Sequence, residues 1–480
     1  MGLRFYDALA AGKRDFVPVR EGKVGMYFCG MTVQDQPHVG HMRAAITGDL
    51  FRRYLEFKGF DVTFITNFTD VDDKIIARAN EEGVTYQVVA ERNIDAYLEY
   101  SDLLNIKRAR IYPKATEHIP EIISLIQTLI EKGHAYQGGA DVYFDVSSFR
   151  GYGKLSKKKT DDLQVGARVD PGEQKRSGLD FALWKGAKEG EPYWDSPWGR
   201  GRPGWHIECS AMSMKYLGDT LDFHGGGQDL IFPHHENEIA QSEAATGKEF
   251  VRFWVQNGLV RLTGEKMSKS TGHFFSMADI SREVDPEVLR LYLLSTHYRS
   301  AIEFSRERLV EAGEAMDRFR NLFTALEEIL GDRSALGPPS GAALGDRERT
   351  LMEAVERART EFIEAMDDDL NSARAVGSLY ELVREANTFV AAGEVSADGK
   401  AVLHELETTL RTLGGILGLF EKPAEAAEIP PEVHGLVADR EEARKAKNWA
   451  EAHRLRDEIQ EKGYVLEDKA DGTRIKPAKS

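Results

Sequence analysis

Cys29, His38 and His41 lie in one short stretch, between a predicted strand at 24–28 and a predicted helix at 42–57. The strand is apolar and aromatic, and the helix carries apolar residues at helical spacing. The amino end of a helix attracts phosphate, and ligands bind at the carboxyl ends of strands in α/β sheets. The stretch therefore predicts a site for a phosphate-bearing ligand. The alternative is two surface histidines and a buried thiol.

A second candidate phosphate site lies far downstream. Lys266 and Lys269 flank Met267-Ser268 in a loop bounded by glycines, so both ammonium groups could close over a triphosphate. Phosphoryl chemistry needs positive charge and positioning more than a covalent role for the protein. Short loops of lysine and serine are common, so a chance occurrence is the alternative.

Cys29 also belongs to a set of four side chains that could hold a metal ion. Glu238 follows His234 by four positions, which places both on one face of a helix. The only two cysteines, Cys29 and Cys209, are each expected at the end of a strand or the start of a helix. Two thiolates, an imidazole and a carboxylate suit zinc. The alternatives are helix-capping residues with two core cysteines, or a disulfide, which a reducing compartment disfavours.

Length and charge limit the class of protein. A chain of 480 residues exceeds one hydrophobic core, so we expect two to four domains. The net charge of −16 argues against nucleic-acid binding over the whole surface but permits local basic patches, for which 154–185 and 440–480 are candidates. Without a run of 18 apolar residues or an apolar secretory core at the start, we expect a cytoplasmic protein without membrane contact.

The predicted elements form an α/β half followed by a helical half. Strands at 24–28 and 61–66 around a helix form a βαβ unit, which implies a parallel sheet. The other expected elements of the first half are helices at 73–82, 87–104, 117–132 and 210–217, a strand from 221, a strand at 251–260, and an insert at 134–202 with a surface strand or two. The second half is expected to hold helices at 286–296, 304–330, 346–366, 370–392, 399–419 and 438–462, then a strand pair at 464–467 and 473–475.

The motifs together resemble a known family. His-x-Gly-His at 38–41, followed by Lys-Met-Ser-Lys-Ser at 266–270, resembles the motif pair of class I aminoacyl-tRNA synthetases. The strings at 67–74, 204–210, 224–230 and 232–238 resemble those of the cysteinyl-tRNA synthetases in particular. This resemblance covers essentially the whole chain.

The resemblance implies a Rossmann-type α/β catalytic domain with a parallel sheet and an inserted subdomain, then an α-helical bundle and a small C-terminal anticodon-recognition module. The implied boundaries are 1–133 and 203–260 for the two catalytic halves, 134–202 for the insert, 261–303 for the lysine loop and stem-contact region, 304–422 for the bundle and 423–480 for the C-terminal module.

The activity implied is that of a cysteine–tRNA ligase. Such an enzyme selects L-cysteine with the help of zinc, forms cysteinyl-adenylate from ATP with release of pyrophosphate, and transfers cysteine to the 3′ end of tRNA(Cys). Two alternatives remain. One is the related ligase that joins cysteine to an amino-sugar inositol in mycothiol synthesis, a family without the C-terminal module. The other is an inactive synthetase-derived binding protein, a class that usually loses parts of these motifs.

Residue roles follow from the same resemblance. Carried over by position, they are Cys29, Cys209, His234 and Glu238 for one Zn²⁺; Thr32, Trp205 and His224 for the cysteine pocket; Asp229 for the ribose; and His38, Gly40, His41, Lys266 and Lys269 for catalysis and ATP. Lys269 is expected to stabilise charge on the α-phosphate, Mg²⁺ to accompany ATP, and the chain to be a monomer. Four protein ligands normally close a zinc site, so the metal must reach five ligands or Glu238 must yield.

Several positions leave open questions. Met31, Gln34 and His273 differ from the residues usual in the family, and the first two affect the expected wall of the cysteine pocket. Asp72, Asp73 and Lys74 are expected to form a structural ion network beneath the site. Near the C-terminus, Trp449 could stack on an RNA base beside several arginines, or be a buried anchor of its helix.

Overall fold

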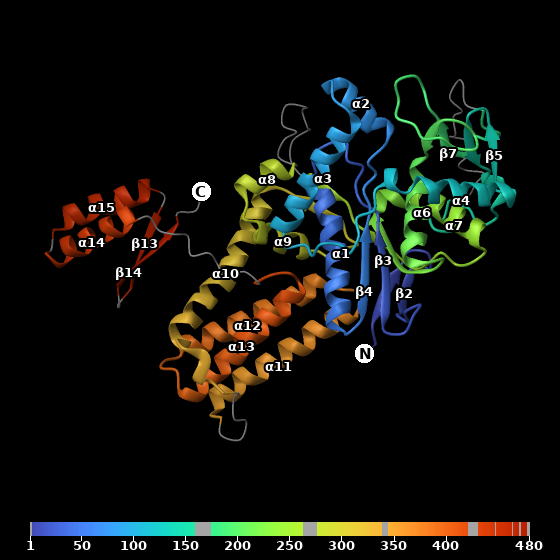
Figure 1. The fold of residues 1–480 in the computed structure, drawn as a ribbon. Helices are drawn as coiled ribbons and strands as arrows, with labels where there is room; N and C mark the ends of the chain where they lie inside the picture. Colours follow the sequence, from blue (N-terminus) through green and yellow to red (C-terminus); the bar gives the residue numbers. More distant parts are fainter. Residues whose placement is uncertain are drawn as a thin grey trace. The chain divides into compact units, whose positions relative to one another are not determined.

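The structure is a computed structural model of the chain, shown in Figure 1. It describes residues 2–158, 174–262, 276–337, 344–420, 431–446, 448–462, 464–469 and 472–477. The chain divides into two compact units, Met1–Leu419 and Phe420–Ser480, which are treated separately below.

A four-stranded parallel sheet forms the centre of the first unit. Its strands are β3 (Lys23–Phe28), β4 (Asp61–Thr66), β9 (Leu221–Gly227) and β10 (Val251–Asn257), in the order β10-β9-β3-β4. Tyr27 of β3 lies opposite Ile65 of β4 on one side and His224 of β9 on the other. The predicted parallel sheet is therefore confirmed, and the carboxyl ends of β3 and β9 lie next to each other.

The predicted strand at 251–260 is divided in the structure. β10 ends at Asn257, and β11 (Val260–Leu262) pairs instead with β12 (Ile302–Phe304), a strand that was not predicted. Gly258 lies between these two strands and packs closely against the backbone of Ser300, since a Cβ at position 258 would lie 2.3 Å from the Ser300 carbonyl oxygen. The close approach of this distant segment ends the first strand.

Helix α1 (Val39–Phe57) lies on one side of β3 and β4, and α6 (Trp205–Leu217) lies on the other side (Figure 1). A hairpin that was not predicted, β1 (Arg4–Asp7) with β2 (Gly12–Asp15), packs beside β10. Phe5 of β1 joins Phe51 of α1 and Phe223 of β9 in a buried aromatic cluster. This cluster fixes α1 against the sheet.

The remaining helices of the catalytic half match the predicted positions with small shifts. They are α2 (Asp73–Glu82), α3 (Tyr86–Leu103), α4 (Ile119–Glu131) and α7 (Glu236–Thr246). One expectation was wrong: Cys209 lies inside α6, not at its start. The helix begins at Trp205, directly after Gly204, whose backbone is extended. Gly204 packs so closely on Ala182 that a Cβ at position 204 would collide with the Ala182 carbonyl group.

The insert is a larger sheet than predicted. Its described part contains four antiparallel strands, β5 (Ala135–Gly138), β6 (Asp141–Phe144), β7 (Phe181–Gly186) and β8 (Gly201–Pro203), instead of one or two surface strands. Trp184 of β7 is fully buried in its core. Lys185 Nζ lies 2.6 Å from a carboxylate oxygen of Asp73, and Arg202 pairs with the same carboxylate. These ion pairs join the insert to α2.

Helices follow to the end of the first unit. They are α8 (Met277–Glu283), α9 (Pro286–Leu294), α10 (Arg306–Leu330), α11 (Asp346–Asp367), α12 (Ser372–Ala391) and α13 (Ala397–Ile416). The five long helices predicted here are confirmed within a few residues at each end, whereas α8 was not predicted.

The described part of the second unit contains two helices and a hairpin. The prediction of one helix over 438–462 was wrong, because α14 (Pro431–Lys445) and α15 (Trp449–Glu461) are separate. Asn448 ends the connection by accepting a hydrogen bond from the backbone N–H of Glu451, as an N-cap does. The antiparallel pair β13 (Tyr464–Lys469) and β14 (Gly472–Pro477) is confirmed. Trp449 is 56% exposed, which excludes the buried-anchor interpretation.

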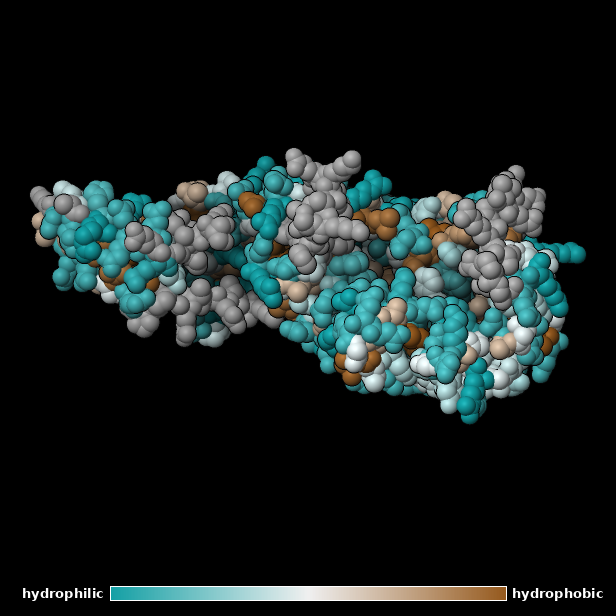
Figure 2. All heavy atoms as spheres, turned by 90° about the horizontal axis from the view of Figure 1, so that it is seen from above, coloured by the Kyte–Doolittle hydropathy of each residue, from teal (hydrophilic) through white to brown (hydrophobic). Residues whose placement is uncertain are grey.

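The surface is mainly hydrophilic on the face shown in Figure 2, where hydrophobic residues occur in small scattered groups. Among the helices in the described ranges, none combines the length and the apolar character that a membrane crossing would require.

Candidate active site

Two histidines cap the amino end of α1. His38 Nδ1 accepts hydrogen bonds from the backbone N–H groups of Gly40 at 3.1 Å and His41 at 3.4 Å. His41 Nδ1 in turn accepts from the backbone N–H of His38 at 3.2 Å, and the two rings stack with centroids 3.7 Å apart. Because each Nδ1 acts as an acceptor, a neutral ring carries its proton on Nε2. Both Nε2 atoms are therefore donors.

Burial keeps these two imidazoles neutral. It lowers the pKa of His41 to about 3 and also lowers the pKa of His38, an effect that a backbone hydrogen bond and the charge of Asp229 oppose. Gly40 is needed between them, since a Cβ at this position would lie 2.9 Å from the His38 ring. The helix end therefore offers uncharged N–H donors in addition to its own dipole.

The four residues expected to bind metal converge. Cys29 follows β3, and Cys209 lies in the second turn of α6. His234 comes from the helical segment that leads into α7, and Glu238 lies in the first turn of α7. One ligand atom from each lies within 4.8 Å of all the others. Residues separated by up to 209 positions in sequence therefore meet at the carboxyl end of the sheet.

The distances fit a tetrahedral ion. With Zn–S near 2.3 Å and Zn–N or Zn–O near 2.1 Å, tetrahedral geometry places two sulfurs about 3.8 Å apart, sulfur and oxygen about 3.6 Å apart, and nitrogen and oxygen about 3.4 Å apart. The two sulfurs lie 3.9 Å apart, Cys29 Sγ lies 3.6 Å from Glu238 Oε1, and that oxygen lies 3.1 Å from His234 Nε2. The donor set and its spacing therefore suit zinc.

Charge is already present in the cluster. The hydrogen bond from Cys29 lowers the pKa of the Cys209 thiol to about 6, although burial opposes the shift. Burial would raise the pKa of Glu238, but the charges of His224 and His234 hold it well below its usual value. Burial raises the pKa of Cys29, which keeps its proton. A divalent cation would displace that proton and complete the charge balance.

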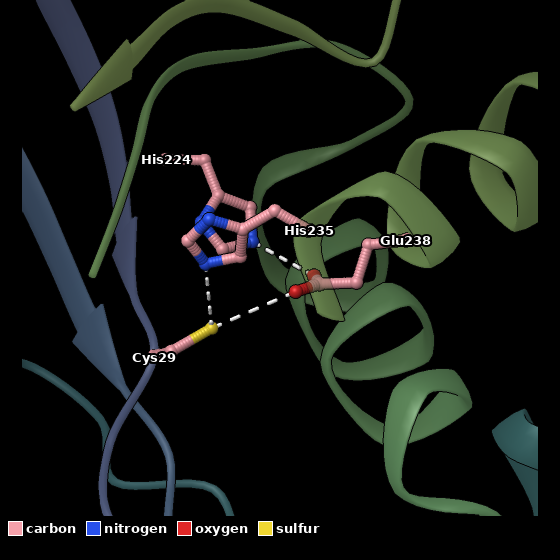
Figure 3. Close-up of side chains that lie close together, drawn as sticks. All are labelled: Cys29, His224, His235 and Glu238. Carbon is pink, nitrogen blue, oxygen red and sulfur yellow. Dashed lines mark hydrogen bonds and ion pairs between the residues drawn. The ribbon is translucent and has the colours of Figure 1, made fainter. Parts of the chain in front are cut away.

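Two more histidines lie against this cluster (Figure 3). His224 Nε2 lies 2.8 Å from Glu238 Oε2, and His235 Nε2 lies 3.5 Å from Cys29 Sγ. His224, which was expected to line the cysteine pocket, has a fully buried ring that contacts Glu238. His224 and Glu238 are 14 residues apart in the sequence and meet only in the folded chain, so no sequence pattern indicated this contact.

His206 and Trp205 orient His234. The Nδ1 atoms of the two histidines are 2.9 Å apart, so one ring must donate to the other and the Nε2 atom of His234 faces the carboxylate. The Trp205 ring stacks on His234 with centroids 4.4 Å apart. Sequence reasoning missed the roles of His206 and His235, although each is next to a residue that it had selected.

A cavity of about 400 Å³ joins the helix end to the cysteine cluster. The predicted site residues on its wall are Cys29, Thr32, His38, Gly40, His41, Trp205 and Asp229. Met31 and Gln34, which differ from the family, also line it, as does Lys74. The predicted ion network is present only in part: Asp73 pairs with the insert, whereas Asp72 caps α2. Lys266, Lys269 and His273 lie outside the described residues.

Comparison with known families matches three consecutive segments. Residues 15–314 match the family described as tRNA synthetases class I (C) catalytic domain, 361–421 match the DALR domain, and 426–475 match the cysteinyl-tRNA ligase anticodon binding domain. The last match covers most of the second structural unit.

Full-length relatives and solved structures agree with these matches. The chain is 49% identical over 478 residues to a cysteine–tRNA ligase of Caldicellulosiruptor saccharolyticus, covering 99% of this chain and 100% of that one. It is 50% identical over 484 residues to one of Heliobacterium modesticaldum, covering 100% of both. Methionyl-tRNA synthetase of Mycobacterium tuberculosis in complex with methionyl-adenylate shares the fold, with a TM-score of 0.65 and 16% identity over 82% of this chain and 91% of that chain. The chain belongs to the cysteine–tRNA ligase family of class I aminoacyl-tRNA synthetases.

Proposed function

We propose that the chain selects L-cysteine at a zinc ion, activates it with ATP and transfers it to the 3′ end of tRNA(Cys). Membership of the cysteine–tRNA ligase family supports the overall reaction. The observation that carries the proposal is the convergence of Cys29, Cys209, His234 and Glu238 beside the cavity that also contains the amino end of α1. A sulfur-binding centre for cysteine and a phosphate-binding helix end for ATP would then lie in one site.

Cys29, Cys209, His234 and Glu238 would hold the zinc ion. When bound, zinc would supply a Lewis acid that prefers thiolate sulfur to a hydroxyl group, and so would distinguish cysteine from serine. Apolar contacts alone separate such near-isosteres by only about 1–3 kcal/mol. Trp205, 37% exposed and stacked on His234, would cover the substrate side chain from the cavity side.

For activation, the cysteine carboxylate attacks the α-phosphorus of ATP and pyrophosphate leaves. The Nε2–H donors of His38 and His41, aided by the helix dipole, would bind phosphate oxygens. Lys266 and Lys269, assigned from the family motif, would stabilise charge on the phosphates, with Mg²⁺ accompanying ATP. Asp229 would accept hydrogen bonds from the ribose. In the second step a ribose hydroxyl of the tRNA attacks the carbonyl carbon and AMP leaves.

The second structural unit would bind the anticodon of tRNA(Cys). Its match to an anticodon binding domain supports this role, and the exposed ring of Trp449 could stack on an unpaired base. We propose that the enzyme acts as a monomer in the cytoplasm.

Pyrophosphate exchange with each of the amino acids tests the proposal, followed by charging of purified tRNA(Cys). Cysteine alone should support exchange, and the tRNA should become charged. Exchange with cysteine that leads to a product with amino-sugar inositol but not with tRNA would instead favour the mycothiol-type ligase. Absence of exchange with any amino acid would indicate a binding protein without activity.

A further inference from the structure

The site contains two overlapping groups of possible metal ligands. The first is the proposed zinc set, and the second consists of Cys29, His224, His235 and Glu238 (Figure 3), whose ligand atoms also lie within 4.8 Å of one another. The groups share the Cys29 sulfur and the Glu238 carboxylate. Distance and residue type therefore do not decide which pair completes the ligand set.

Gln256 resolves the choice at His235. This residue of β10 is 5% exposed, and its Nε2 atom lies 2.9 Å from His235 Nδ1. An amide nitrogen only donates, so His235 Nδ1 must present a lone pair and the ring carries its proton on Nε2. That N–H points at Cys29 Sγ, 3.5 Å away. A nitrogen that carries a proton has no lone pair for a metal.

The orientation of the amide follows from its surroundings. With Nε2 toward His235, the buried Oε1 of Gln256 and the second N–H of its amide have no hydrogen-bond partner among the described residues. The opposite orientation would leave both amide N–H groups buried without an acceptor. The stated orientation leaves one N–H and the carbonyl oxygen unpaired, and an unpaired buried carbonyl occurs more often in proteins than an unpaired buried N–H, which favours the donor facing the histidine.

His224 is protonated toward the cluster in the same way. Its Nε2 atom contacts the Glu238 carboxylate, which only accepts, so this nitrogen carries a proton. The rings of His224 and His235 both pack on Trp254, with centroids 4.7 Å and 5.1 Å from it. Trp254 is itself buried, so neither ring can easily rotate to present its other nitrogen.

We propose that Gln256 is a positioning residue that excludes His235 from the metal's ligand set and makes it a hydrogen-bond donor to the Cys29 thiolate. This inference rests on the proposed zinc site and adds to it. It assigns to one buried amide the choice between two candidate ligand sets. Residues that lie outside a metal's ligand set commonly fix, by hydrogen bonding, the tautomer and orientation of the histidines close to the metal.

Gln256→Glu tests the inference because it preserves shape and reverses the hydrogen bond. A carboxylate accepts from Nδ1–H, so the lone pair of His235 moves to Nε2 and faces the metal. In purified protein, X-ray absorption at the zinc edge should show two sulfurs, one imidazole nitrogen and one oxygen per zinc for the native chain. The variant should gain an imidazole nitrogen, with fewer than two sulfurs per zinc or more than one zinc per chain. One zinc with the native ligands in the variant would overturn the inference.

His235→Phe supplies the matched control, since phenylalanine keeps a ring against Trp254 but has no nitrogen. In this background Gln256→Glu should leave the zinc shell unchanged. A measurement on the native protein avoids the question of whether a variant folds. Nitrogen NMR of the chain labelled with ¹⁵N-histidine should show that His235 is protonated on Nε2. The His235 signals are assigned by their absence in His235→Phe. Protonation on Nδ1 would overturn the inference. A native chain that binds no zinc would instead refute the proposed function itself.

Discussion

Helix α1 connects two buried polar clusters of opposite character. Midway along the helix, Asp49 accepts from Arg53 at 2.8 Å and from Arg290 of α9 at 2.5 Å. Arg290 also donates to the carbonyl oxygens of Leu417 and Leu104. At its amino end the helix faces the cavity beside the cysteine cluster. There, buried atoms such as His224 Nδ1 and Gln256 Oε1 have no hydrogen-bond partner in the described part of the chain.

The difference separates a structural cluster from a functional one. In the first, guanidinium groups are matched by a carboxylate and main-chain oxygens, which joins the sheet domain to the helical bundle. In the second, polar groups are buried with incomplete pairing, an arrangement that costs stability unless a ligand completes it. The following predictions test this distinction, beginning with the largest expected effect.

Cys209→Ser should abolish the functional cluster while leaving the fold. Structural zinc sites contribute about 10–16 kcal/mol, or roughly 3–4 kcal/mol per ligand, which corresponds to about a 10³-fold loss of zinc affinity. Cysteine-dependent exchange should fall with it, as measured by metal analysis and exchange on one preparation. Ser213→Ala is the control, because Ser213 is also buried in α6 and lies one turn after Cys209 but is not a proposed ligand. Zinc retained in Cys209→Ser would remove this residue from the ligand set.

Arg290→Met should have the opposite effect: it should lower the stability of the fold and leave zinc binding unchanged. It leaves several buried oxygens without a donor, so the first structural unit should lose about 3 kcal/mol of stability. Zinc per folded chain should stay unchanged. The surface variant Arg384→Met, which removes a pair with Glu381 in which both side chains are mostly exposed, should cost less than about 1 kcal/mol. Thermal unfolding followed by tryptophan fluorescence measures both, and equal effects of the two variants would contradict the assignment.

His38→Asn separates capping from catalysis at the helix end. Asparagine is a favourable N-cap, so the melting temperature should hardly change, whereas loss of the Nε2–H donor should slow exchange by about 10²-fold. His38→Ala should lose both functions, with about 1 kcal/mol of additional destabilisation. A normal exchange rate in His38→Asn would show that its ring does not bind the phosphates.

The smallest effect concerns pH. Burial lowers the folded-state pKa of His41 to about 3, below its unfolded value near 6.5, so only the unfolded chain takes up this proton between those values. The stability contribution is therefore complete above pH 6.5 and decreases as the pH falls toward 3. Unfolding measured from pH 7 to 5 should depend less steeply on pH in His41→Asn than in the native chain. Identical slopes would contradict a His41 that stays neutral in the folded chain.

The sequence was sufficient for the parts that depend on local pattern. The hydrophobic spacing of 42–57 predicted α1, and the strands on either side of it predicted the parallel sheet. The four ligand candidates followed from the spacing of His234 and Glu238, the two cysteines and the family resemblance. Where distant segments decide the outcome, prediction failed. β12 exists because it pairs with β11, and the strand at 251–260 is interrupted because Ser300 packs on Gly258. The long predicted helix at 438–462 is divided by the cap at Asn448, a local signal that apolar spacing alone did not reveal.

The surroundings of the metal candidates show the same limit. Gln256 and His235 are 21 residues apart, and their hydrogen bond forms only where β10 meets the segment that precedes α7 in the folded chain. His224 was selected from its motif, but the motif did not reveal its contact with Glu238. The residue types that carry chemistry can be found in the sequence, whereas the partners that orient them belong to the tertiary structure.

The most direct measurement is anomalous diffraction at the zinc edge from crystals grown with cysteine. The account predicts one peak surrounded by Cys29, Cys209, His234 and Glu238, with the substrate sulfur about 2.3 Å away. A peak elsewhere, no peak, or cysteine bound with its sulfur away from that position would contradict it.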